Sequence, residues 1–220
     1  MIKLKKNAVV LFIGDSIPDY ERTRPVGEGL FNAWGRSYVA DVGSLLGCMY
    51  PEMGIRVKNV GISGNQVRDL EKRWETDVLE RKPDWVSVLI GINDVWRQFD
   101  LQNMPKTWVM PDLYRKTLKS LIERTKPNVK GIFLLTPIYW ELNENDAMNA
   151  RVREYAQICR EVAEETGAIF VDVQKNVDSV LNRIKHSCYF SWDRVHPNNP
   201  GHYVIARSLL DAMGVEYSRS

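Results

Sequence analysis

Five short runs of apolar residues alternate with longer amphipathic segments along the chain. Most of these runs are nearly continuous in Val, Ile, Leu and Phe and do not alternate with polar residues, which is typical of strands covered on both faces. We therefore predict five buried strands, at residues 8–13, 57–61, 85–90, 131–136 and 169–173.

The segments between these runs carry apolar residues at helical spacing. Residues 67–80, 113–122 and 152–165 show this pattern, and Gly167 is placed to end the third of these helices. A last helix is expected to start after Pro200. Alternating strands and helices predict an α/β fold of three layers, α/β/α, in which helices cover both faces of a parallel sheet.

Composition places the chain among ordinary globular proteins. Its 220 residues suit one domain, residues 1–220, and 44% of them are hydrophobic and 26% charged. The net charge of +2 gives no concentrated basic surface, so nucleic acid is not expected as a partner. No stretch reaches the ~18 apolar residues that would span a membrane. The three cysteines form no CxxC motif, which favours reduced thiols and a cytoplasmic location.

Ser16 directly follows the first predicted strand, at the edge where parallel sheets bind ligands. A serine there serves as a helix N-cap about as often as a nucleophile, and it becomes a nucleophile only beside a base. Among the histidines, His186 is expected at the surface and His202 in a structural role at the last helix. His196 lies after the fifth strand with Asp193 three residues before it, so this carboxylate can orient the imidazole. We therefore predict that Ser16, His196 and Asp193 form a catalytic triad.

Two glycine-containing loops follow the second and third predicted strands. Each is by itself best interpreted as a plain turn. Acyl transfer, however, needs donors for a developing oxyanion, and loss of one donor typically costs ~2.7–4 kcal/mol. The candidate donors are the N–H groups of Ser16 and Gly64 and the side-chain amide of Asn93.

Four segments together resemble the sequence blocks that name the SGNH (GDSL-type) hydrolases, and they occur in the family's order. They are residues 14–17 (GDSI), 61–65 (GISGN), 91–94 (GIND) and 193–196 (DRVH). The resemblance implies a five-stranded flavodoxin-like sheet and no cofactor. It also implies Ser16 as nucleophile, His196 as base and Asp193 as acid, with Ser16, Gly64 and Asn93 forming the oxyanion hole. Pro18 stands where members more often carry Thr, which affects the turn after the nucleophile and leaves the triad intact.

Within this family, the chain is similar to the intracellular acetyl xylan esterases of Gram-positive bacteria. The similarity to these esterases rests on Arg22, Arg24-Pro25, residues 67–70 (VRDL), residues 95–97 (VWR) and residues 192–197 (WDRVHP). It implies a serine esterase that removes acetyl groups from acetylated xylo-oligosaccharides or other acetylated sugars. It also implies a homo-oligomer.

Seven tryptophans are many for a chain of this length. Trp96, Trp140 and Trp192 follow predicted strands, and aromatic rings suit the apolar faces of sugars. For any single one of them a core or subunit-interface position is about twice as common. We take Trp96 and Trp192, together with Asp15, as the candidates for substrate contact. Residues 99–111, which include Trp108, lack clear periodicity and are expected to border the site or a neighbouring subunit.

Other functions remain open at this point. The same residues could act on lysophospholipids, thioesters or aryl esters, although the short polar loops after the first two strands argue against long acyl chains. A different class is a non-catalytic flavodoxin-like binding domain, in which Ser16, Asp15 and Asp94 are structural. A third is a metal-dependent phosphohydrolase, but no HxH, HExxH or Cys/His motif accompanies the aspartates, so no metal site is expected.

Overall fold

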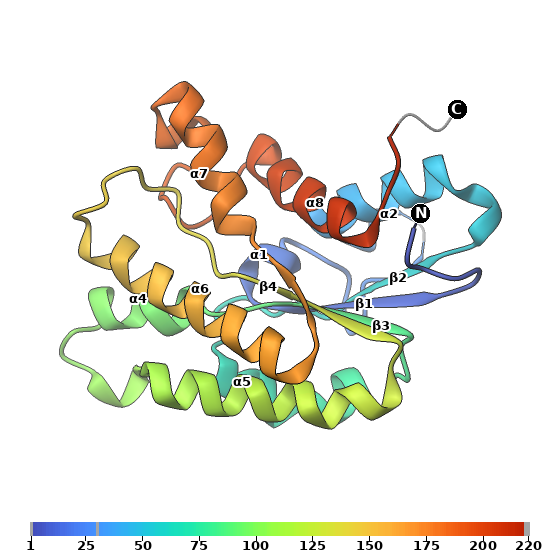
Figure 1. Cartoon of the computed structure of the whole chain (residues 1–220), viewed down its shortest axis with the longest axis horizontal. Helices are drawn as coiled ribbons and strands as arrows, with labels where there is room; N and C mark the ends of the chain where they lie inside the picture. The colour runs from blue at the N-terminus through green and yellow to red at the C-terminus, as the bar shows by residue number, and fades with distance from the viewer. Residues whose placement is uncertain (1, 30, 218–220) are drawn as a thin grey trace.

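The computed structural model describes residues 2–29 and 31–217, and a five-stranded parallel sheet forms its centre. The strands lie in the order β2-β1-β3-β4-β5 (Figure 1). This order is that of flavodoxin-like folds, so the fold class expected from the sequence is confirmed. The strands are β1 Val9–Gly14, β2 Arg56–Asn59, β3 Trp85–Leu89, β4 Gly131–Leu135 and β5 Ile169–Val171.

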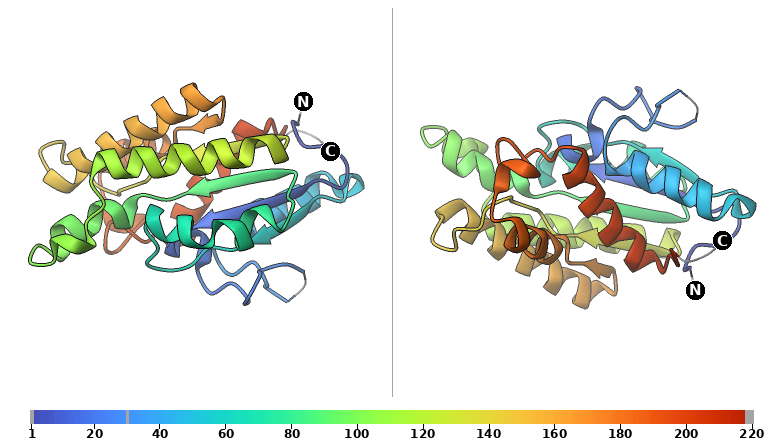
Figure 2. Two further views of the ribbon diagram at one scale, coloured as in Figure 1. Left: turned by 90° about the horizontal axis from the view of Figure 1, so that it is seen from below. Right: turned by 90° about the horizontal axis from the view of Figure 1, so that it is seen from above.

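Helices cover both faces of the sheet. Seen from below, one face carries α3 Val67–Trp74, α5 Pro111–Thr125 and α6 Ala147–Thr166 (Figure 2). Seen from above, the other face carries α2 Tyr38–Met49 and α8 Asn199–Met213, and α7 Val173–Ile184 packs against α8. Two further helices, α1 Ser16–Asp19 and α4 Ile92–Asp100, begin just after β1 and β3. The expected three layers are therefore present.

The predicted strands agree with the structure to within two residues at each end, whereas four of the α-helices named above had no prediction. These are α1, α2, α4 and α7. Helix α7 begins two residues after β5, because Asp172 caps it by accepting a hydrogen bond from the Lys175 N–H. Our prediction that the His196 loop follows the fifth strand is corrected accordingly: that loop follows α7. The predicted helix at residues 67–80 ends in a π-helical turn, Glu75–Leu79.

A single hydrophobic core includes the strands and the inner faces of the helices. Trp140 belongs to this core, fully buried and stacked on Phe190 with 5.3 Å between ring centroids. Its predicted place on the site face is therefore wrong, since the ring turns inward after β4. Among the described residues, no helix is both long enough and apolar enough to cross a membrane. All three cysteines are free, with Cys159 buried.

Candidate active site

The turn between β1 and α1 presents Ser16 at the carboxyl edge of the sheet. Asp15 caps α1 by accepting a hydrogen bond from the Ile17 N–H at 2.9 Å, so Ser16 is the first residue of the helix. The Asp15 side chain is buried in the core and does not line the cavity in front of Ser16. Substrate contact by Asp15, as expected from the sequence, is thus corrected to a capping role.

The loop that carries His196 is held in shape by its own side chains. Asp193 Oδ1 accepts hydrogen bonds from the N–H groups of Val195 and His196, at 2.9 and 2.7 Å. The Ser191 hydroxyl donates to the carbonyl of His196 at 2.8 Å. The buried segment after β4 also anchors the loop, because the N–H of Trp140 donates to the carbonyl of Arg194. The imidazole therefore projects from a loop with little freedom.

Ser16, His196 and Asp193 form a continuous chain of hydrogen bonds. Ser16 Oγ lies 3.0 Å from His196 Nε2, and His196 Nδ1 lies 2.6 Å from Asp193 Oδ2. Partial burial alone would raise the pKa of Asp193, but hydrogen bonds from His196 and Val195 hold it below its usual value. The carboxylate is therefore ionised and can stabilise an imidazolium. This geometry suits transfer of the serine proton to histidine.

Gly64 and Asn93 border the same cavity as Ser16. Gly64 has φ +81°, a left-handed conformation that favours glycine, and its N–H donates to no acceptor within the described part of the chain. The Asn93 amide donates to the carbonyl of Asn65 at 3.1 Å, and its oxygen accepts from Arg97 at 3.4 Å. These contacts fix which end of the amide faces the cavity and leave its second N–H for a ligand.

The cavity in front of Ser16 measures about 370 Å³, and both polar and aromatic side chains form its walls. Trp96 forms one wall and meets the His196 ring edge-on, 5.8 Å between centroids, while Arg97 stacks over Trp96 at 4.6 Å. Trp192 does not line the cavity and is 88% exposed. The cavity is lined by Ser16, Tyr20, Glu21, Ser63, Gly64, Asn93, Trp96, Arg97 and His196.

The sequence did not predict a role in the site for four of these lining residues: Tyr20, Glu21, Ser63 and Arg97. Each lies within one of the recognised blocks or a few positions after one, so the blocks mark where such residues fall. The blocks do not show which side chains turn toward the cavity. Trp108, expected near the site or an interface, is half-buried and donates to the carbonyl of Leu101.

Two buried carboxyl groups, Asp15 and Asp94, lie behind the site. Burial raises the pKa of Asp15 to about 7, although the Ile17 N–H and His196 lower it. Burial also raises the pKa of Asp94 to about 8, and the charge of Asp15 adds to this. Asp94 Oδ1 accepts from the N–H that begins α3, at Val67. Both groups thus act as helix caps inside the core.

His202 has a structural position, as the sequence predicts. It is buried, its Nδ1 accepts a hydrogen bond from the N–H of Tyr38, and burial lowers its pKa to about 4. His186 is exposed. Within residues 2–29 and 31–217, no group of three or more His, Cys, Asp or Glu side chains is arranged to hold a metal ion.

Comparison with known proteins agrees with this geometry. A model of the GDSL-like lipase/acylhydrolase family matches residues 12–204. The chain is 52% identical to an acetylxylan esterase from Geobacillus stearothermophilus over 219 residues, 100% of both chains. The solved structure of an acetylxylan esterase from that organism superposes with a TM-score of 0.97, again over 100% of both chains. Structures of three alanine variants, described as catalytic mutants, replace a serine, an aspartate and a histidine in that esterase.

Proposed function

Because the chain belongs to the GDSL-like lipase/acylhydrolase family and is a carboxylic ester hydrolase, we propose that it removes acetyl groups from acetylated xylo-oligosaccharides or other acetylated sugars. The observation that carries this proposal is the hydrogen-bonded chain from Ser16 through His196 to Asp193, of which Ser16 and His196 line a small cavity.

In the first half of the reaction the Ser16 hydroxyl attacks the ester carbonyl while His196 Nε2 accepts its proton. Asp193 stabilises the imidazolium that forms. The carbonyl oxygen becomes an oxyanion, which the N–H groups of Ser16 and Gly64 and the amide of Asn93 stabilise. As the tetrahedral intermediate collapses, His196 gives its proton to the departing sugar oxygen and an acetyl group remains on Ser16.

In the second half a water molecule takes the place of the sugar. His196 removes a proton from this water as its oxygen attacks the acetyl carbonyl. The same three donors hold the second oxyanion, and collapse of the intermediate releases acetate and restores the Ser16 hydroxyl. Every step uses side chains and backbone groups of this chain.

Two observations support an acetylated sugar over other esters. The 52% identical relative is itself an acetylxylan esterase, and its aspartate and histidine variants described as catalytic are three positions apart, as Asp193 and His196 are here. None of the described residues that line the cavity has an aliphatic side chain, so a long acyl chain would find no extended apolar channel there. We also propose a homo-oligomer, because the segment between α7 and α8 leaves two aromatic side chains exposed, Tyr189 by 54% and Trp192 by 88%, and aromatic residues are enriched at subunit interfaces.

The test is acetate release from acetylated xylo-oligosaccharides by wild type and Ser16→Ala. We expect release by wild type and loss of nearly all turnover in the variant, with an unchanged melting temperature. Hydrolysis of p-nitrophenyl acetate without release from the sugar would keep the serine mechanism and reject the sugar substrate. Wild-type rates in Ser16→Ala would reject the mechanism and favour a non-catalytic role for this serine.

A further inference from the structure

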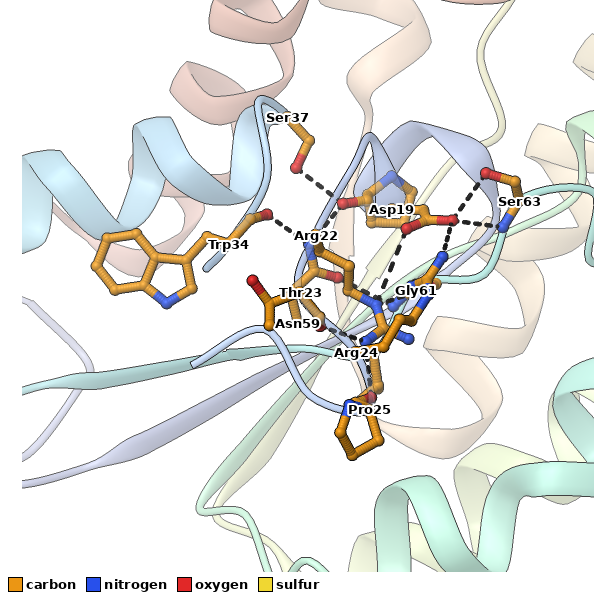
Figure 3. A network of polar contacts seen from close by, with 12 residues as sticks. Asp19, Arg22, Thr23, Arg24, Pro25, Trp34, Ser37, Asn59, Gly61 and Ser63 are labelled. Carbon is orange, nitrogen blue, oxygen red and sulfur yellow. Dashed lines mark hydrogen bonds and ion pairs between the residues drawn. The ribbon is translucent and has the colours of Figure 1, made fainter. Parts of the chain in front are cut away.

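Asp19 lies in the same short helix as Ser16, and its carboxylate holds the loop that carries Gly64. Asp19 Oδ2 accepts hydrogen bonds from the N–H of Ser63 at 2.9 Å and from its hydroxyl at 2.8 Å (Figure 3). Ser63 immediately precedes Gly64. One carboxylate, only 3% exposed, therefore links the helix of the nucleophile to the residue before the candidate oxyanion donor.

Two arginines hold Gly61, the first residue of the loop that carries Gly64. We call this loop, residues 61–65, the oxyanion loop. The carbonyl of Gly61 accepts hydrogen bonds from Arg22 Nε at 2.7 Å and from Arg24 Nη1 at 3.1 Å. Arg24 Nη2 also donates to Asp19 Oδ2 at 2.7 Å (Figure 3). The oxyanion loop is thus tied at Gly61 and at Ser63 to residues on or just after the nucleophile helix.

The backbones of the oxyanion loop and helix α1 are in direct contact. A Cβ atom on Gly61 would lie 2.6 Å from the Asp19 nitrogen, too close for any side chain. Asn59 extends this contact, because its amide donates to the carbonyl of Pro18 at 2.6 Å and its oxygen accepts from the Gly61 N–H at 3.0 Å. The loop therefore cannot shift without disturbing the helix that begins at Ser16.

The charges of this cluster are set by the same contacts. Burial alone would raise the pKa of Asp19, but hydrogen bonds from Arg24 and Ser63 hold it below its usual value, so the carboxylate is ionised. Burial lowers the pKa of Arg22 to about 10, which leaves it charged at neutral pH. Buried ion pairs add little net stability, because desolvation offsets their attraction. What this cluster supplies is a fixed geometry between two chain segments.

We propose that Asp19 is a positioning residue for the oxyanion hole. Its ionised carboxylate, held by Arg24, fixes Ser63 and thereby sets the place of the Gly64 N–H relative to Ser16. The inference rests on the proposed function, because it concerns the oxyanion hole of that reaction. A displacement of about 1 Å in a catalytic arrangement can cost on the order of 100-fold in rate. The position of the oxyanion loop therefore matters for turnover more than for substrate affinity.

The test is Asp19→Asn. All three partners of Asp19 Oδ2 are donors, so the variant's amide oxygen would take the Oδ2 position. This neutral oxygen lacks the charge that holds Arg24, and the amide nitrogen would lie at the Oδ1 position, where Arg22 Nε is 4.0 Å away, so the grip on Ser63 and Arg24 weakens. We expect kcat to fall about 10- to 100-fold, while KM for the acetyl ester stays within about twofold. The affinity for ethylboronic acid, which forms a tetrahedral anion on Ser16, should fall by about the same factor as kcat.

A second pair of variants does not depend on the buried carboxylate. Ser63 is exposed, so its substitution leaves the core intact. Ser63→Ala removes the hydroxyl bond to Asp19 and keeps the backbone one, and we expect a smaller fall in kcat than for Asp19→Asn. Ser63→Thr keeps the hydroxyl and should restore the wild-type rate. If Asp19→Asn does not fold, the rates of Ser63→Ala and Ser63→Thr test the positioning role in its place.

Asp84→Asn is the matched control. Asp84 also accepts from a backbone N–H and a cation, Val9 at 2.9 Å and Lys130 at 2.7 Å, but at the opposite end of β1. It should leave kcat and boronate affinity unchanged. If Asp19→Asn behaves like Asp84→Asn, or loses activity only through KM, while Ser16→Ala is inactive, the positioning role is overturned and the proposed function stands. If Ser16→Ala keeps its activity, the proposed function itself fails.

Discussion

The hydroxyl of Ser16 lies 3.0 Å from Nε2 of His196, although 180 positions separate the two residues. The carboxyl end of β1 supplies the serine, and the loop between α7 and α8 supplies the histidine. The N–H of Tyr38 at the start of α2 donates to Nδ1 of His202 in α8, which fixes these two helices to each other beside the site. Proton transfer between Ser16 and His196 therefore requires no rearrangement of the chain.

Asp193→Asn should nearly abolish turnover while preserving the loop. Its Oδ1 position can still accept from Val195 and His196, so the backbone is kept. The new Nδ2, however, would donate to His196 Nδ1 and impose the tautomer whose Nε2 carries a proton. That nitrogen could not accept the proton of Ser16, and we expect a fall in kcat on the order of 10⁴-fold.

The measurement is steady-state hydrolysis of p-nitrophenyl acetate together with the melting temperature. Asp193→Ala serves as the comparison, since it also loses the loop contacts and should lower the melting temperature as well. A loss of less than tenfold in Asp193→Asn at an unchanged melting temperature would contradict the assigned role of Asp193.

Asn93→Ala should lower kcat by roughly 100- to 1,000-fold, because it removes one oxyanion donor. Arg97→Met should have a smaller effect in the same direction, since Asn93 would keep its bond to the carbonyl of Asn65 but lose the contact that holds its oxygen. The double variant should be no slower than Asn93→Ala alone. Kinetics of all three variants provide the check, and additive losses would show that Arg97 acts independently of Asn93.

Much of this arrangement could be predicted from the sequence. Continuous apolar runs mark buried strands, and parallel strands end at one edge of the sheet, so residues 14–16, 61–65 and 91–94 had to lie close together. The family resemblance then assigned roles to Ser16 and His196.

The direction of individual side chains could not be predicted. Trp140 and Trp192 both lie in post-strand or loop segments, yet one is fully buried and the other 88% exposed. Asp15 turns into the core to cap α1 while Ser16, its neighbour, faces the cavity. Nothing in the spacing of Asp19 and Ser63 indicates their contact, because it depends on how the loop after β2 packs on α1. Such details depend on tertiary packing, which periodicity does not encode.

Short acyl groups should be strongly preferred. The cavity measures about 370 Å³, and none of the described residues that line it has an aliphatic side chain, so each added methylene gains little apolar contact. We expect kcat/KM to fall at least tenfold from p-nitrophenyl acetate to the butyrate, and further for the octanoate. Trp96→Ala should widen the cavity and reduce this discrimination, whereas Trp192→Ala, outside the cavity, should not change it. An octanoate rate equal to the acetate rate would favour a lipase-like substrate.

The contribution of Asp15 to the stability of the protein should fall as pH rises from about 4 to about 7. Burial raises the pKa of Asp15 to about 7 in the folded protein, while an unfolded aspartate titrates near 3.9. Between these values the folded state keeps a proton that the unfolded state has lost, so the free energy of unfolding decreases with increasing pH. His202 opposes this effect between about pH 4 and pH 6.5, because burial lowers its pKa to about 4 and only the unfolded state binds its proton there. Carboxylates with a lowered pKa, such as Asp193, also act in the opposite sense, at lower pH.

Asp15→Asn isolates this contribution. The amide oxygen can still accept from the Ile17 N–H, so the cap of α1 is kept, but the group no longer ionises. Urea unfolding at pH 4.5 and pH 7.5 should therefore show a smaller decrease in stability for Asp15→Asn than for wild type. Asp94→Asn should flatten the profile too, because burial raises the pKa of Asp94 to about 8. Parallel pH profiles for Asp15→Asn and wild type would mean that Asp15 is ionised in the folded protein throughout this range.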